Sequence, residues 1–180
     1  MSQTTQPPFP GGQPQMPPLL VNGQFVKDLS FEVPGAPQIY ANLRGTPQVN
    51  VNLDVQVQPL SQTPRVYEVG IAVRVEAREP SQSQNGEPPQ PAAEARVVFI
   101  AEFIYAGVFT LNNVPDNMVE PILMVECPRL LFPYARNLLA DITREGGFPP
   151  LVLQPVDFVA LWQMRRAQAA EATAGPVAHA

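Results

Sequence analysis

Val97-Val-Phe-Ile-Ala-Glu-Phe-Ile-Tyr105 constrains the architecture of this 180-residue chain more than any other segment. Its β-branched and aromatic residues are typical of a strand. One face would carry Val97, Phe99, Ala101, Phe103 and Tyr105, and the other Val98, Ile100 and Ile104. Only Arg96 and Glu102 interrupt the apolar pattern. A strand that is apolar on both faces must be covered on both, by its own domain or by another chain.

Three further strands are predicted upstream. Residues 49–57 and 67–75 alternate apolar and polar positions strictly, which indicates half-buried strands that pair antiparallel with one wet face. A fourth strand is predicted over Gly23–Glu32, where Phe25, Lys27, Leu29 and Phe31 would share a face.

The last third of the chain changes to helical spacing. A long helix is predicted from Leu131, Ala135, Leu138, Leu139 and Ile142, with Pro128 and Pro133 tolerated only near its start and Gly146-Gly147 as its end. A shorter helix is predicted to begin near Pro155, with Phe158, Leu161 and Trp162 on one face. Strands followed by helices indicate an α+β fold.

Composition sets the limits of the folded domain. Six prolines within residues 1–21 predict a disordered extension, and residues 80–92 and 169–180 predict a flexible loop and a disordered tail. The folded part is therefore expected over residues 22–168 as a single domain.

Charge and hydropathy exclude several classes of partner. The net charge of −5 argues against nucleic-acid binding. Hydrophobic residues make up 45% of the chain and charged residues only 15%, so part of the apolar surface should be covered by other chains. With no signal-peptide pattern, no apolar run long enough to span a bilayer and a single cysteine, a cytoplasmic protein is expected.

The sequence lacks an arrangement of residues that would support catalysis. The single histidine, His179, lies in the predicted tail, so it cannot serve Cys127 as a base, and the two cannot form a zinc site. The carboxylate pairs Asp28/Glu32 and Asp116/Glu120 are typical of solvated surface. The sequence therefore predicts a binding protein without cofactor or metal, not an enzyme. Tyr40, Phe132 and Tyr134 are the candidates for binding other polypeptides, since they lie beside loops and the helix start.

Several segments in order resemble the SecB family of bacterial protein-export chaperones. They are Phe25–Pro37, Val49–Asp54, Tyr67–Val69, Val98–Phe103, Ala106–Phe109, Gly147–Leu151, Pro155–Leu161 and the most specific one, Cys127-Pro-Arg-Leu-Leu-Phe-Pro-Tyr-Ala-Arg136. The resemblance covers roughly residues 22–165. It implies a four-stranded antiparallel sheet with one long and one short C-terminal helix, assembled as a homotetramer that is a dimer of dimers.

The resemblance also implies a function and its residues. A SecB-like protein would be an ATP-independent holdase that binds unfolded precursor proteins and delivers them to the SecA motor. By motif, SecA binding falls on Asp28, Glu32, Ile100 and Glu102, and the oligomer interface on Ala101, Phe103 and Tyr105. Two alternatives remain open: a SecB-like chaperone dedicated to one partner such as an antitoxin, and a small hydrolase or isomerase that uses Asp28, Glu32 or Glu102.

Overall fold

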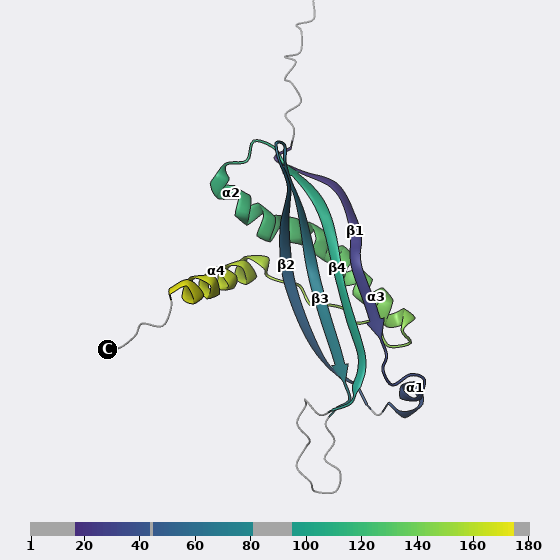
Figure 1. Ribbon diagram of the computed structural model, residues 1–180. Helices are drawn as coiled ribbons and strands as arrows, with labels where there is room; N and C mark the ends of the chain where they lie inside the picture. The colour runs from purple at the N-terminus through teal and green to yellow at the C-terminus, as the bar shows by residue number, and fades with distance from the viewer. Residues whose placement is uncertain (1–16, 44, 81–94, 175–180) are drawn as a thin grey trace, which may run out of the picture.

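The computed structural model describes residues 17–43, 45–80 and 95–174, which form a four-stranded antiparallel sheet and a set of helices (Figure 1). The α+β fold predicted from the sequence is therefore confirmed. In chain order the elements are β1 (Leu19–Glu32), α1 (Gln38–Asn42), β2 (Gln48–Gln62), β3 (Arg65–Arg78), β4 (Val97–Leu111), α2 (Asp116–Pro121), the π-helical turn η1 (Ile122–Glu126), α3 (Cys127–Glu145) and α4 (Phe158–Ala174).

The strand order is β1-β4-β3-β2, so the doubly apolar strand β4 is internal and pairs with β1 and β3. An internal position satisfies the backbone of β4 on both sides and leaves β1 and β2 as the sheet edges. The sheet thus buries its most hydrophobic strand between neighbours.

Helix α3 covers one face of the sheet and runs behind it in Figure 1. Every fourth residue of α3 from Leu131 to Thr143 is buried, as expected of one helix face packed on a sheet. The buried residues on the covered face of the sheet include Val55, Val69, Ile71, Val73, Val75, Ala77, Phe99, Ala101, Phe103, Phe109 and Leu111. Burial of such side chains contributes roughly 25 cal/mol per Å² of apolar area, which makes this layer the main source of stability.

Strand β1 departs from the sequence prediction in its start and in its phase. It begins at Leu19, inside the segment that the sequence predicts to be disordered. Irregularities at Val21/Gly23 and Val26/Asp28 shift its register against β4. Because a bulge reverses the side to which later residues point, Phe25 lies opposite Ala106 on one face while Leu29 lies opposite Phe103 on the other. The prediction that Phe25, Lys27, Leu29 and Phe31 share a face is wrong.

The long helix also starts earlier than the sequence indicates, because α2, η1 and α3 form a continuous helical run from Asp116. Pro133 therefore lies well inside the run instead of near its start. In η1 the amide of Cys127 bonds the carbonyl of Ile122, five residues back, a wider turn that passes the chain into Pro128. The predicted end is confirmed: α3 stops at Glu145, and Gly147 takes a left-handed φ of 83°.

Helix α4 spans 17 residues and is longer than the sequence indicates, since Ala169–Ala174 is helical where a disordered tail is predicted. The carboxylate of Asp157 accepts bonds from the amides of Val159 and Ala160 and caps its N-terminus. Arg165 of α4 reaches the edge strand β2, where it donates to the carbonyl of Val55 at 2.7 Å and pairs with Asp54. The remaining parts of the predicted extension, loop and tail (residues 1–16, 81–94 and 175–180) lie outside the described residues.

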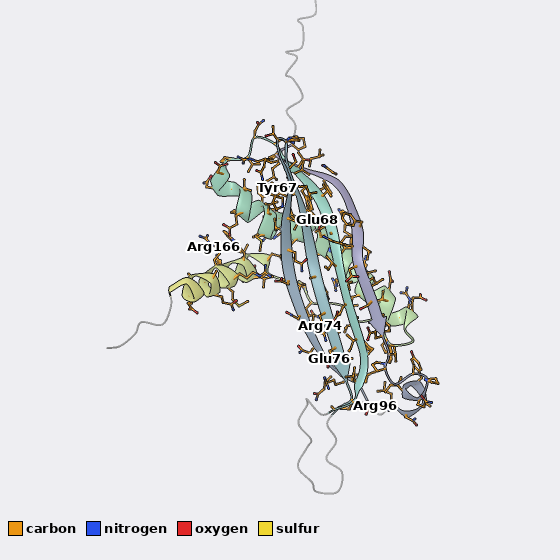
Figure 2. All side chains as sticks on the ribbon, in the orientation of Figure 1. Tyr67, Glu68, Arg74, Glu76, Arg96 and Arg166 are labelled. Atoms are coloured by element: carbon orange, nitrogen blue, oxygen red, sulfur yellow. The ribbon has the colours of Figure 1, made fainter. Side chains whose placement is uncertain are left out.

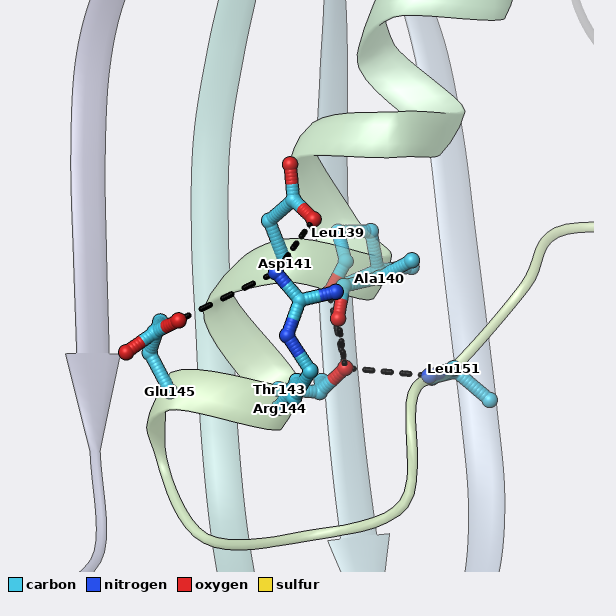
Figure 3. Close-up of polar contacts among 7 residues, drawn as sticks. All are labelled: Leu139, Ala140, Asp141, Thr143, Arg144, Glu145 and Leu151. Carbon is cyan, nitrogen blue, oxygen red and sulfur yellow. Dashed lines mark hydrogen bonds and ion pairs between the residues drawn. The ribbon is translucent and has the colours of Figure 1, made fainter.

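A buried hydroxyl joins α3 to the segment that follows it (Figure 3). Thr143 is fully buried, and its Oγ1 lies 2.8 Å from the carbonyl of Leu139 and 3.1 Å from that of Ala140. The same oxygen accepts the amide hydrogen of Leu151 at 3.0 Å. One side chain therefore fixes the direction in which the chain leaves α3.

The thiol of Cys127 is also buried, at the first residue of α3. Burial, and secondarily the nearby charge of Glu126, raises the pKa of Cys127 to about 12. Since the thiolate is the nucleophilic form, a thiol with this pKa is inert at neutral pH.

We expect Thr143→Val to lower the free energy of unfolding by about 1–3 kcal/mol, because it leaves the partly buried amide of Leu151 without its acceptor. Urea unfolding at fixed protein concentration measures the change. Asp141→Asn is the control: it removes an exposed ion pair to Arg144 and should cost less than ~0.5 kcal/mol. Equal losses in the two variants would contradict the proposed importance of Thr143.

We expect Cys127 to react with iodoacetamide at pH 8 about a hundredfold or more slowly in the native protein than in the urea-unfolded chain, since burial both blocks access and keeps the thiol protonated. The native rate should show no plateau between pH 7 and pH 10, because the thiolate forms only as the pH approaches the raised pKa. Mass spectrometry of timed samples measures both rates. Native labelling as fast as in urea would contradict the burial.

Candidate functional site

The second face of the sheet, opposite α3, is not crossed by any described helix (Figure 1); we call it the open face. Its side chains form regular rows, because directly paired residues of antiparallel strands point to the same side. From β1 to β2, three successive rows read Asp28, Ile104, Ala72, Asp54; then Ser30, Glu102, Arg74, Asn52; then Glu32, Ile100, Glu76, Asn50.

Basic residues on the open face are each paired with a carboxylate. Lys27 bonds Glu68 at 2.5 Å, Arg74 pairs with Glu102, and Arg78 pairs with Glu76. Figure 2 shows Glu68, Arg74 and Glu76 in line along β3, in the middle of the sheet. Within the described part of the chain, Asp28 and Glu32 have no such partner, so β1 presents two uncompensated negative charges.

A shallow hollow of about 290 Å³ lies on the open face. Ala72 and Ile104 belong to its apolar lining, and Asp28, Asn52, Arg74 and Glu102 supply its polar groups. An apolar floor with charged groups around it is suited to an apolar side chain flanked by a charged one.

The open face brings together the four residues that the sequence predicts for SecA binding. Asp28 and Glu32 are exposed on β1, and Ile100 and Glu102 are neighbours on β4. The same exposure removes Asp28 and Glu32 as candidate acid or base groups, since such a group needs a buried carboxyl facing a pocket. The side chain of Glu102 is 41% exposed and is ion-paired. Of the other carboxylate pair, Asp116 bonds Arg65 and Glu120 accepts the indole hydrogen of Trp162.

The three residues predicted for the oligomer interface lie on the covered face. Ala101 and Phe103 are 0% and 2% exposed beneath the chain's own helix layer. Tyr105 is half-buried, and its ring stacks on Tyr134 of α3 at 5.9 Å. Burial, and then the neighbouring Tyr134, raises the pKa of Tyr105. Of the three, Tyr105 alone reaches the surface, and Ala101 and Phe103 are core residues in this chain.

Tyr40, a predicted client-binding residue, belongs to an aromatic cluster at one end of the sheet. Its ring lies 5.4 Å from Phe148, which lies 5.0 Å from Phe99, which stacks on Phe31 at 5.4 Å. The hydroxyl of Tyr40 donates to the carbonyl of Gly146 at 2.9 Å, yet half of the residue remains exposed. We call these four residues the aromatic cluster.

The other two predicted client-binding residues lie elsewhere, so the structure does not bring the three together. Tyr134 is 52% exposed on α3, and Phe132 packs edge-on against the buried Phe158. Sequence reasoning missed the contact of Tyr40 with Phe148 and, through it, the joining of Tyr40 to Phe99 and Phe31. The one available signal was the Phe148-Pro-Pro segment directly after the helix stop.

Residues 17–43, 45–80 and 95–174 contain no group of three or more side chains that could hold a metal ion. In the same residues, no helix is long and apolar enough to cross a bilayer.

Comparison with known proteins agrees with the geometry. The family model described as "Preprotein translocase subunit SecB" matches residues 12–169. A protein-export protein SecB of Granulibacter bethesdensis is 60% identical over 159 residues, which cover 88% of each chain. One from Acidiphilium cryptum is 60% identical over 154 residues, 86% of this chain and 92% of that protein.

A solved structure shows the same fold at low sequence identity. It is a SecB-like chaperone of Mycobacterium tuberculosis in complex with a peptide from an antitoxin, with a TM-score of 0.58 and 15% identity over 77% of this chain and 91% of that chain. With a family model that matches most of its length and relatives at 60% identity, the chain belongs to the SecB family of protein-export proteins.

Proposed function

We propose that this protein is an ATP-independent holdase that binds unfolded precursor proteins in the cytoplasm and delivers them to the SecA motor for export. The observation that carries the proposal is the division of the molecule into two unlike surfaces. Partly exposed aromatic rings lie at the end and on the helix side of the sheet, and a charged face with an apolar floor lies on the other side. Family membership supports the same function.

Client binding is assigned to the aromatic cluster and to exposed rings such as Tyr134 of α3. An unfolded chain exposes apolar side chains, and burial of their surface against such rings stabilises the complex by roughly 25 cal/mol per Å². Rings lose little conformational entropy on binding and accept many side chains, so specificity is low. Several weak subsites on one assembly raise retention through effective concentration.

Motor docking is assigned to the open face around Asp28, Glu32, Ile100 and Glu102. The uncompensated charges of Asp28 and Glu32 suit a basic partner segment, and Ile100 supplies apolar contact beside them. Clients and motor would then occupy opposite layers of the protein and would not compete for the same side chains.

Assembly into a homotetramer, a dimer of dimers, accounts for the apolar surface that one chain leaves exposed. Edge strand β1 exposes Leu20, Val21, Phe25, Val26 and Leu29, and α3 exposes Leu130. Tyr105, at the rim of the covered face, is the interface residue with direct access to a neighbour.

A chaperone dedicated to one antitoxin is the alternative. The solved complex with an antitoxin peptide is that of a chain only 15% identical, so it supports the fold alone, whereas the relatives at 60% identity are export proteins. The export function is therefore the one we propose.

We expect the purified protein, without nucleotide, to delay the refolding of a slow-folding precursor diluted from denaturant when the assembled protein is in stoichiometric excess. Tyr40→Ala should weaken retention, because it removes an exposed ring from the aromatic cluster. Fluorescence of the refolding client measures the delay, and native mass spectrometry of the same samples reports the oligomer. Unhindered refolding with an intact oligomer would refute the holdase proposal.

We expect Ile100→Arg and Asp28→Lys, each alone, to weaken binding to SecA of the same organism about tenfold, or ~1.4 kcal/mol, while client retention persists. Asp116→Lys is the matched control, because it reverses an exposed carboxylate on α2, away from the open face. Titration calorimetry gives the affinities. Loss of client retention together with SecA binding would mean that these residues support assembly instead of docking.

A further inference from the structure

Arg74 lies at the centre of the open face, among the residues assigned to docking, and nothing in the sequence patterns singled it out. Its direct strand neighbours are Glu102 on β4 and Asn52 on β2, and all three line the hollow. The guanidinium pairs with Glu102 and lies 3.9 Å from a carboxylate oxygen of Glu76. Figure 2 shows Arg74 and Glu76 close together on β3.

The charge of the hollow depends on this one residue. Asp28 and Glu102 contribute the negative charges of its lining, and Arg74 contributes the positive charge. Without Arg74, the hollow would be an apolar floor with two carboxylates, which would attract any polybasic segment. With Arg74, a purely basic segment meets a like charge in the middle of the site.

The ion pair of Arg74 is open to exchange. The side chains of Arg74 and Glu102 are 53% and 41% exposed, so water screens the pair and a partner can separate the two groups at small cost. Once separated, Glu102 can accept a lysine or arginine of the partner, and Arg74 can bind a carboxylate in the bidentate manner that its planar fork favours.

We infer that Arg74 is a specificity-determining residue of the docking face, which makes the hollow select a partner segment that carries an acidic residue beside a basic residue and an apolar one. The inference rests on the proposed docking function and adds to it the chemistry of the docking segment. Arg74 both rejects segments of one charge sign and supplies a contact to the correct one, as specific interfaces commonly do.

The test compares Arg74→Gln with the unchanged protein against two probes: SecA of the same organism, and an oligolysine peptide. Arg74→Gln should weaken SecA binding about fivefold or more while oligolysine binding becomes about twofold or more tighter and depends more steeply on salt. Arg144→Gln, an equally exposed arginine on α3, is the matched control and should change neither. A purely structural role for Arg74 would not move the two affinities in opposite directions.

A charge-swapped variant distinguishes direct contact with the partner from neutralisation of charge within the sheet face. Arg74→Glu combined with Glu102→Arg restores an ion pair of reversed polarity between the same two strands. If both residues contact the partner, SecA binding stays weak in the swapped variant, which supports the inference. Recovery of SecA binding in that variant would show that the pair only holds the sheet face in order, and would overturn the inference.

Two other outcomes have distinct meanings. If Arg74→Gln tightens the binding of both probes, or changes neither, the specificity role is refuted while docking on the open face stands. If the unchanged protein does not bind SecA at all, the docking function itself is refuted, and the assignment of Arg74 falls with it.

Discussion

The packing of α3 on the face of β4 that contains Ala101 and Phe103 is the interaction on which the rest of the molecule depends. β4 is apolar on both sides and lies inside the sheet, so one of its faces must be removed from water by the chain's own helix. Once α3 takes that face, the other face of the sheet is left open. The proposed separation of a charged docking surface from an aromatic client surface follows from this packing of α3 on one face of the sheet.

Much of the fold was predictable because hydrophobic periodicity is local. The alternation in β2 and β3, the helical spacing from Leu131 to Ile142 and the stop at Gly146-Gly147 each depend on near neighbours in the sequence. The sequence-based predictions are wrong where the local pattern and the tertiary structure disagree. The bulge at Val26/Asp28 reversed the phase of β1, and neither the π-helical turn before Pro128 nor the helix beyond Ala169 has a clear periodic signal.

The candidate site was predictable in part because short, contiguous sequence motifs contain some of its residues. Asp28, Glu32, Ile100 and Glu102 were carried over by motif, and they do lie on one face. Arg74 was not identified, because the role inferred for it depends on the strand pairing that places it opposite Glu102, more than twenty residues away in sequence. The aromatic cluster likewise joins β1, α1, β4 and the segment after α3, which no sequence window contains.

The bond from Arg165 to the carbonyl of Val55 has a consequence for the symmetry of any assembly. A sheet with two free edges can add copies head to tail, edge to opposite edge, and such growth has no natural end. With its guanidinium on the β2 backbone and Asp54 held beside it, α4 obstructs one of those edges. The unobstructed edge is β1, and two β1 edges that meet each other form a two-fold contact that closes on itself. If copies of this chain pair through their sheet edges, Arg165 of α4 thereby favours a finite particle over a fibre.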